Sequence, residues 1–188
     1  HMTQREFIDF LNKVEVLKHN TRHCWGADGR RESVAEHCWR LSLMPMLVKD
    51  EFPYVDIDKV IKMCIIHDLG EAVTGDIPAF EKTDDDEIKE AQLLRELLSS
   101  LPENVKAEFV SLLDEMDELK TPEAKLYKAF DNLEAVISHN EAPLDTWTDI
   151  EYSANLTYGD DKVAWHPWLT VLRKEIRNDT EKKIAEAD

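Results

Sequence analysis

Apolar side chains recur every three or four residues along most of this chain, which is the spacing of amphipathic α-helices. Several helix starts are marked by capping residues: Ser33 and Glu36 form a capping box, and Thr121 precedes Pro122. The pattern predicts helices that begin near residues 3, 33, 60, 83, 102, 121, 148 and 167. Hardly any stretch alternates with a period of two, so we expect an all-α fold of about seven or eight helices.

The most informative segment spans residues 60–78. Its first part, Val60 to Ile66, is apolar except for Lys62, as in a buried helix. Four polar residues follow: His67, Asp68, Glu71 and Asp76. Burying an imidazole and three carboxylates is costly unless something pairs them, and a divalent cation satisfies many acceptors at once. The segment therefore predicts a metal site, although an adjacent His and Asp can also be an ordinary polar pair that closes a helix.

The composition favours one ordered, helix-rich domain over the 188 residues, since 43% are hydrophobic and only 5 are glycine. We expect His1 to be the remnant of a cleaved tag and residues 178–188 to form a charged, frayed tail. No apolar run approaches the ~20 residues of a membrane span. An odd set of three cysteines without a CxxC pair fits reduced thiols and a cytoplasmic location.

The charge is strongly negative: 40 acidic against 23 basic residues give a net charge of −17. Such a chain repels polynucleotides and anionic membranes, so we expect neither as a partner. A small anionic substrate would need a local cationic patch. The loop at residues 20–32 provides one with Arg22, Arg30 and Arg31, whose guanidinium groups suit phosphate oxygens. For Arg30 and Arg31, an ordinary solvated surface role is an equally good interpretation.

Four candidate ligands lie on three different predicted helices: His37, the His67–Asp68 doublet and Asp131. Two imidazoles and two carboxylates form a mixed nitrogen and oxygen set that suits Mn, Co, Fe, Ni or Zn. Helical bundles build metal sites by letting several helices converge on one ion. We expect Cys38 to lie on a different helical face from His37 and do not nominate it as a ligand.

Two further motifs flank the doublet: Glu32-Ser-Val-Ala-Glu-His37 precedes it and Glu71-Ala-Val-Thr-Gly-Asp-Ile-Pro78 follows it. In this order the motifs resemble those of the HD-domain phosphohydrolases, and most closely those of the small 5′-deoxynucleotidase branch. The similarity extends from the first predicted helix through Asp131 and, more weakly, to the last helix. No histidine occurs between residues 69 and 130, so the two-metal members of the family are a poorer match.

The resemblance implies a single HD-type helical bundle that binds one divalent metal ion (Mn, Co, Fe, Ni, Zn or Mg). Its metal ligands would be His37, His67, Asp68 and Asp131. Glu71 would match a catalytic acid or base, Asp76 a carboxylate that contacts substrate or water, and Arg22 a phosphate-binding arginine. The branch usually has tryptophan directly after that arginine, where it helps to exclude ribose. Here that position is His23, and Trp25, two residues later, is a substrate-binding candidate that would take the place of that tryptophan, which leaves the sugar selectivity open.

These inferences combine into one hypothesis: a metal-dependent phosphomonoesterase that removes the 5′-phosphate from nucleoside 5′-monophosphates, with the deoxy forms preferred, by means of a metal-activated water. Glu71 would transfer the proton, and Arg22, together with Arg31, would hold the phosphate. The alternatives are another HD phosphohydrolase that acts on dNTPs or an alarmone, or a non-catalytic nucleotide-binding module with a structural metal. The resemblance also implies a homodimer.

Overall fold

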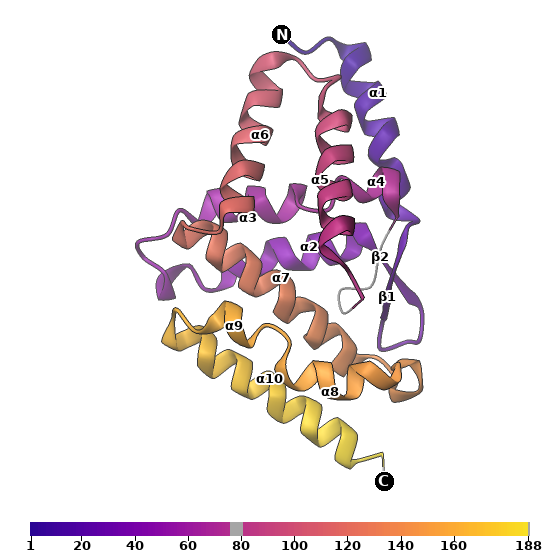
Figure 1. The fold of residues 1–188 in the computed structure, drawn as a ribbon, viewed down its shortest axis with the longest axis vertical. Coiled ribbons are helices and arrows are strands. Elements are labelled where there is room, and N and C mark those ends of the chain that lie inside the picture. The colour runs from indigo at the N-terminus through magenta and orange to yellow at the C-terminus, as the bar shows by residue number, and fades with distance from the viewer. Residues whose placement is uncertain (76–80, 188) are drawn as a thin grey trace.

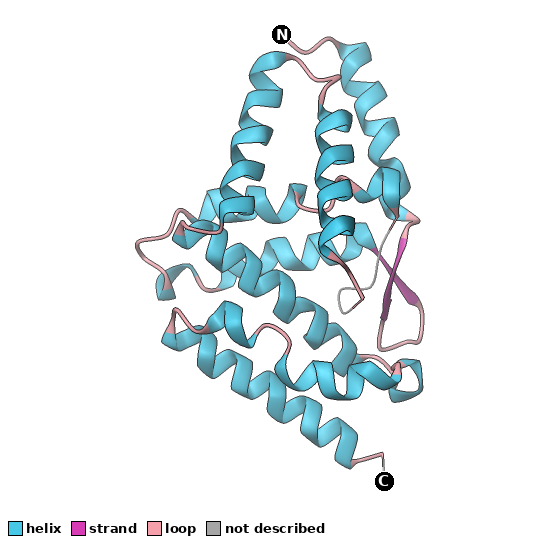
Figure 2. Ribbon diagram, viewed as in Figure 1, coloured by secondary structure: helices cyan, strands magenta, loops and turns pink. Residues whose placement is uncertain are grey.

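The computed structural model describes residues 1–75 and 81–187, and almost all of its secondary structure is helical (Figures 1 and 2). The prediction of an all-α bundle is confirmed, with eight α-helices of nine residues or more in the described part of the chain. In chain order the α-helices are α1 (Gln4–Val14), α2 (Val34–Leu47), α3 (Ile57–Ile66), α4 (Glu71–Thr74), α5 (Asp84–Leu98), α6 (Glu103–Glu118), α7 (Pro122–Glu141), α8 (Asp149–Thr157), α9 (Asp160–Val163) and α10 (Pro167–Ala185). Short 3₁₀ turns cover Glu15–Lys18, Lys49–Glu51 and Leu144–Thr146.

Helix α7 crosses the middle of the molecule and organises the core (Figure 1). Helices α2 and α3 pack against each other and against α7, while α9 and α10 cover another side of α7. The buried apolar side chains at these contacts include Leu41, Val60, Met63, Leu126, Phe130 and Leu133. Burying a side chain of this kind contributes about 1.5–3 kcal/mol, so the α2–α3–α7 contact is strongly held. The three predicted ligand-bearing segments therefore meet at the buried core of the fold.

The capping signals place the helix starts where the sequence predicts them. The Ser33 hydroxyl accepts a hydrogen bond from the Glu36 backbone N–H, and the Glu36 carboxylate accepts one from the Ser33 backbone N–H. The Thr121 hydroxyl likewise accepts the Ala124 N–H, with Pro122 at the first helical position. Each such cap stabilises its helix by about 1 kcal/mol. The cap at Ser33 also fixes where along α2 the side chain of His37 emerges.

The loop predicted at residues 20–32 contains a β-hairpin instead. Strand β1 (Thr21–Trp25) pairs antiparallel with β2 (Arg31–Ser33), and Trp25 lies opposite Arg31. The turn passes through Gly29, whose φ of 82° is readily adopted only by glycine. These strands are too short for an alternating pattern to appear in the sequence. The hairpin gives Arg22 a defined position beside α2 and α7.

The helix predicted from residue 60 ends before the doublet. Helix α3 stops at Ile66, and His67 and Asp68 lie in a turn that leads into α4. The turn is tighter than an α-helix, because the Leu69 and Glu71 N–H groups donate to carbonyls three residues earlier, those of Ile66 and Asp68. Asp76 lies outside the described residues. Within the described residues, no helix has the length and apolar character needed to cross a membrane.

Candidate metal centre

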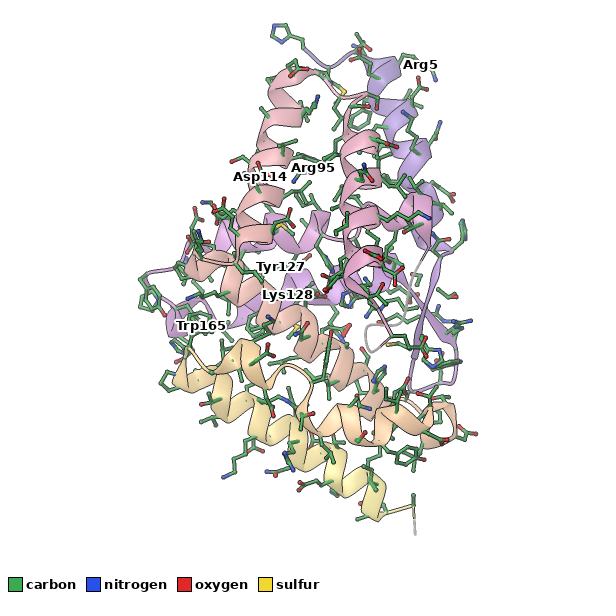
Figure 3. All side chains as sticks on the ribbon, in the orientation of Figure 1. Arg5, Arg95, Asp114, Tyr127, Lys128 and Trp165 are labelled. Atoms are coloured by element: carbon green, nitrogen blue, oxygen red, sulfur yellow. The ribbon has the colours of Figure 1, made fainter. Side chains whose placement is uncertain are left out.

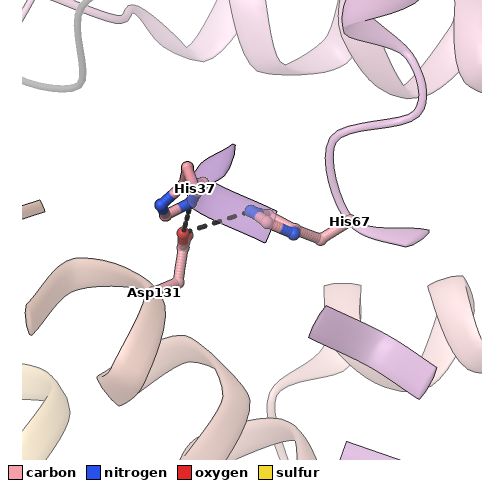
Figure 4. A group of neighbouring side chains, drawn as sticks. All are labelled: His37, His67 and Asp131. Atoms are coloured by element: carbon pink, nitrogen blue, oxygen red, sulfur yellow. Dashed lines mark hydrogen bonds and ion pairs between the residues drawn. The ribbon is translucent and has the colours of Figure 1, made fainter. Parts of the chain in front are cut away.

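The four predicted ligands meet at one point between α2, α7 and the turn after α3. The Asp131 Oδ1 atom lies 3.0 Å from His37 Nε2 and 3.2 Å from His67 Nε2 (Figure 4). The Asp68 Oδ2 atom lies 3.0 Å from His67 Nε2 and 3.8 Å from His37 Nε2. Three of these residues, His37, His67 and Asp131, have ligand atoms that all lie within 4.8 Å of one another. The predicted convergence is therefore present in the structure.

Each imidazole is oriented by a hydrogen bond from its other nitrogen. His37 Nδ1 donates to Glu134 Oε1 at 3.1 Å, and both residues are fully buried. His67 Nδ1 donates to the Cys64 carbonyl at 2.7 Å, which is one of the carbonyls left free at the end of α3. These bonds leave both Nε2 atoms facing the carboxylates. This is the orientation in which metal-ligating histidines are usually held.

The electrostatics of the site follow from burial and the two carboxylates. Burial opposes protonation of His67, but the charges of Asp68 and Asp131 outweigh it and raise the pKa of this imidazole well above its usual value. Burial likewise opposes ionisation of Asp131, yet the His67 charge and the hydrogen bond from His37 hold its pKa well below the usual value. The pKa of Asp68 is also lowered, against the effect of burial, chiefly by His67. The carboxylates of Asp68 and Asp131 are thus ionised, and their buried negative charge requires a positive charge nearby.

A divalent cation fits this demand better than protons do. His67 Nε2 and Asp68 Oδ2 are buried and in contact, but neither has a hydrogen bond of good geometry within the described part of the chain. Nitrogen and oxygen atoms that converge without hydrogen bonding are typical of a metal site. His37, His67, Asp68 and Asp131 would hold the ion.

A cavity of about 560 Å³ opens from the centre. His67, Asp68 and Asp131 lie in its wall, together with Arg22 and Glu71. The Glu71 residue is 3% exposed, and its backbone carbonyl accepts a hydrogen bond from the Asn20 amide at 2.9 Å. This volume lies within the ~300–1,000 Å³ of small-molecule sites.

Arg22 is placed between the metal centre and the hairpin. Its Nη1 atom lies 3.7 Å from Asp68 Oδ2, and its Nε atom lies 3.3 Å from Glu32 Oε2. The neighbouring His23 also lines the cavity, and its Nε2 atom lies 3.2 Å from Glu151 Oε1. Arg22 thus carries positive charge to the edge of a site that is otherwise rich in carboxylates.

The other two substrate-binding candidates, Arg31 and Trp25, are not among the residues that line this cavity. The Arg31 guanidinium lies over the Trp25 ring, 5.3 Å from its centroid, and Arg31 Nε donates to the Arg22 carbonyl at 3.1 Å. Arg30, for its part, forms an ion pair with Glu36. In this structure Arg31 and Trp25 therefore support the hairpin strand that carries Arg22.

Lys128 also lies at the site, although no sequence motif pointed to it. It projects from α7 near the centre of the molecule, next to Tyr127 (Figure 3). Its Nζ atom lies 3.7 Å from Asp131 Oδ2, and it lines the cavity. Lys128 precedes Asp131 by three residues and Glu134 follows it by three, so all three share one face of α7. That spacing was available as a signal in the sequence.

Cys38, which the sequence did not suggest as a ligand, lies close to the metal centre. One ligand atom each of Cys38, His67 and Asp68 lies within 4.8 Å of the others. Cys38 and His37 are adjacent on α2, and His67 belongs to a ligand group with each of them. The thiol therefore belongs to the surroundings of the metal centre.

Comparison with known proteins shows which family the chain belongs to. A sequence profile of the HD domain matches residues 14–170. The human protein 5′-deoxynucleotidase HDDC2 is 27% identical over 97% of this chain and 90% of its own length. The 5′-deoxynucleotidase HDDC2 of Dictyostelium discoideum is 32% identical over 72% of this chain and 75% of its own.

A crystal structure of a predicted metal-dependent phosphohydrolase from Magnetospirillum magnetotacticum is 23% identical to this chain. It superposes with a TM-score of 0.78 over 95% of this chain and 93% of that protein, which shows that the two share a fold. The expectation of an HD-domain enzyme is thereby confirmed. The chain belongs to the HD-domain family and, within it, to the group that contains the HDDC2 proteins.

Proposed function

We propose that this protein is a metal-dependent phosphomonoesterase that removes the 5′-phosphate from nucleoside 5′-monophosphates, with the deoxy forms preferred. The observation that carries the proposal is the position of the four-ligand centre, which opens into a cavity that Arg22, Glu71 and Lys128 also line. A purely structural metal site would be closed off by its ligands. The names of the HDDC2 relatives support the substrate class.

A divalent ion at this centre would supply Lewis-acid activation of a water molecule and neutralise charge on the phosphoryl group. The protein's own contribution begins with the ligands. His37 and His67 are held by hydrogen bonds to Glu134 and to the Cys64 carbonyl, so their Nε2 atoms do not have to reorient when the ion binds. Such preorganisation lowers the cost of binding.

Arg22 and Lys128 would hold the phosphate. They approach the centre from the hairpin and from α7, and each already lies within 4 Å of a ligand carboxylate, Asp68 or Asp131. A chain with a net charge of −17 repels a nucleotide overall, so cations beside the centre would direct the phosphate to it. They would also stabilise the charge that develops on the phosphoryl oxygens.

Glu71 would transfer the proton. It is buried, lines the cavity and lies outside the set of four ligands, which suits a residue that transfers protons rather than one that binds the ion. It would take a proton from the attacking water or deliver one to the leaving 5′-oxygen. Asp76 was nominated for a supporting role from the sequence, and that role remains a prediction.

The test is phosphate release from a panel of dNMPs, NMPs, dNTPs and cyclic nucleotides, with Mn²⁺, Co²⁺, Mg²⁺ and Zn²⁺ supplied in turn. We expect turnover of the monophosphates with at least one of these ions, its loss on chelation, and less turnover of ribonucleotides than of the matching deoxynucleotides. Exclusive turnover of dNTPs would favour the alternative HD activity. No turnover of any substrate with any ion would favour a binding module.

Two variants connect the panel to the site. Asp68→Ala should lose both metal binding and turnover, whereas Glu71→Gln should bind the ion normally and lose turnover by about 100-fold or more. Full turnover in the Glu71→Gln variant would remove this residue from the mechanism. A homodimer and a cytoplasmic location remain predictions, and sedimentation analysis tests the first of them.

A further inference from the structure

The metal centre overlaps with a second set of possible ligands. The first set consists of His37, His67 and Asp131, and the second consists of Cys38, His67 and Asp68. Within each set, one ligand atom per residue lies within 4.8 Å of the others. The sulfur atom is therefore close to the half of the centre that His67 and Asp68 form. His67 is the residue that both sets share.

Two polar atoms of the second set, His67 Nε2 and Asp68 Oδ2, are already placed to bind a cation whether or not the thiol takes part. The side chain of His67 is 4% exposed, its Nδ1 atom is already bonded to the Cys64 carbonyl, and its Nε2 atom has no hydrogen bond of good geometry in the described structure. The buried Asp68 Oδ2 atom, 3.0 Å away, has none either. A nitrogen and a carboxylate oxygen are thus available beside the Cys38 sulfur.

We propose that Cys38, His67 and Asp68 form an alternative site for a thiophilic divalent ion such as Zn²⁺ or Cd²⁺, and that such an ion competes with the catalytic one. Thiolate ligands select Zn²⁺ and softer ions, whereas Mn²⁺ and Mg²⁺ favour oxygen ligands. Binding forms a sulfur–metal bond and releases the thiol proton to solvent. The fourth coordination position would be filled by water.

Competition follows from the shared residues. An ion that the Cys38 sulfur binds also occupies the ligand atoms of His67 and Asp68. Only His37 and Asp131 then remain for the catalytic ion. This inhibition rests on the proposed function, but binding of the thiophilic ion does not. The two parts therefore need separate measurements.

Binding is tested by titrating Cd²⁺ into the metal-free protein and following the ultraviolet charge-transfer band of a cadmium–thiolate bond. The variants are Cys38→Ser and, as the matched control, Cys24→Ser, which removes a thiol in the wall of the cavity that opens from the centre. We expect the band in the wild type and in Cys24→Ser, and its loss in Cys38→Ser with at least about a tenfold weaker Cd²⁺ affinity. The Mn²⁺ affinity of Cys38→Ser should stay within about twofold of the wild type.

A band that persists in Cys38→Ser would overturn the proposal, because another cysteine would then be the ligand. An equal loss of Mn²⁺ and Cd²⁺ affinity would also overturn it, since the substitution would then have damaged the whole centre. Circular dichroism and the melting temperature check that each variant folds. These outcomes are decided whether or not the protein hydrolyses nucleotides.

Inhibition is tested by adding Zn²⁺ to the Mn²⁺-loaded protein during turnover of a deoxynucleoside monophosphate. Zn²⁺ should inhibit the wild type and Cys24→Ser at concentrations at least about tenfold lower than those that inhibit Cys38→Ser. Equal sensitivity of all three proteins would refute the competition. If no protein turns over any substrate, the proposed function fails, and the Cd²⁺ titration still decides whether the alternative site exists.

Discussion

The Oε1 atom of Glu134 lies 3.1 Å from Nδ1 of His37, and neither residue is exposed to solvent. The Glu134 carboxylate is held in turn by the Ser138 hydroxyl at 2.7 Å and by Arg40 at 3.5 Å. Despite its burial, the hydrogen bond from His37 lowers the pKa of Glu134, so its carboxylate is ionised and accepts the His37 proton. Glu134 thus fixes which nitrogen of His37 faces the metal centre.

Replacing Glu134 should therefore weaken metal binding without touching a ligand. We expect Glu134→Ala to reduce the Mn²⁺ affinity about 10–100-fold, because the His37 ring loses the partner that orients it. Glu134→Gln keeps an oxygen acceptor and should lose less. Isothermal titration calorimetry measures both. Glu141→Gln, which alters only the exposed partner of Arg40, is the control. An unchanged Mn²⁺ affinity in Glu134→Ala would rule out this positioning role.

Metal binding should also depend on pH. Although burial opposes it, the neighbouring carboxylates raise the pKa values of His37 and His67, so protons compete with the ion for both Nε2 atoms. The affinity for Mn²⁺ should increase as the pH rises from about 6.5 through the raised pKa values. Each binding event should release protons, which calorimetry in buffers of different ionisation enthalpy detects. A pH-independent affinity would contradict this assignment of the two histidines.

The same groups predict the opposite trend for the stability of the metal-free protein. A histidine whose pKa is raised by folding stabilises the fold when it is protonated. That contribution is fully present below the unfolded value of about 6.5 and is lost as the pH rises through the folded value. The melting temperature of the chelator-treated, metal-free protein should therefore fall as the pH rises above about 6.5. Saturating Mn²⁺ should abolish this decrease. The same pH dependence of the melting temperature with and without Mn²⁺ would contradict this prediction.

The cavity wall predicts that Arg22 and Arg31 differ in importance. Arg22→Lys keeps the positive charge but loses the planar fork that faces both Asp68 and Glu32, so kcat/KM should fall about 100-fold. Arg31→Lys, outside the cavity lining, should have a much smaller effect. Steady-state kinetics on one deoxynucleotide compares the two variants. An equal loss of kcat/KM in both variants would show that Arg31 also contributes to phosphate binding.

Gly70 is predicted to be a packing requirement of the turn that presents the doublet. Its φ of −62° suits any residue, but a Cβ atom there would lie 3.0 Å from the Glu90 carbonyl oxygen and 3.1 Å from Leu94 Cβ. Gly70→Ala should therefore cost about 1–3 kcal/mol through overpacking between α4 and α5. The melting temperature should fall by about 2–4 °C for each kcal/mol. A melting temperature equal to that of the wild type would contradict the close contact.

The convergence of four candidate ligands could be predicted from the sequence because residue type, helical periodicity and family motifs all pointed to the same four side chains. His37 and Asp131 lie on α2 and α7, where the apolar spacing alone places them near the core. The surroundings could not be predicted in this way. The spacing along α7 places Glu134 near Asp131, but its contact with His37 and the position of Cys38 depend on how three helices pack, and no local pattern encodes that packing.

The end of α3 shows the same limit. The apolar run up to Ile66 predicts a helix, but whether the helix continues through the doublet depends on long-range contacts. Here His67 bonds back to the Cys64 carbonyl, and Gly70 allows α5 to approach closely, so the chain turns away. The hairpin at residues 21–33 was hidden for a different reason, since strands of five and three residues are too short to display alternation.

The most direct test of the metal centre is a crystal structure of the protein loaded with Mn²⁺, with an anomalous difference map calculated from the data. We predict a single strong peak at the catalytic centre, about 2.2 Å from one atom each of His37, His67, Asp68 and Asp131. The map should leave part of the coordination sphere open toward the cavity. A peak elsewhere, or an ion that Asp131 does not contact, would contradict the proposed centre.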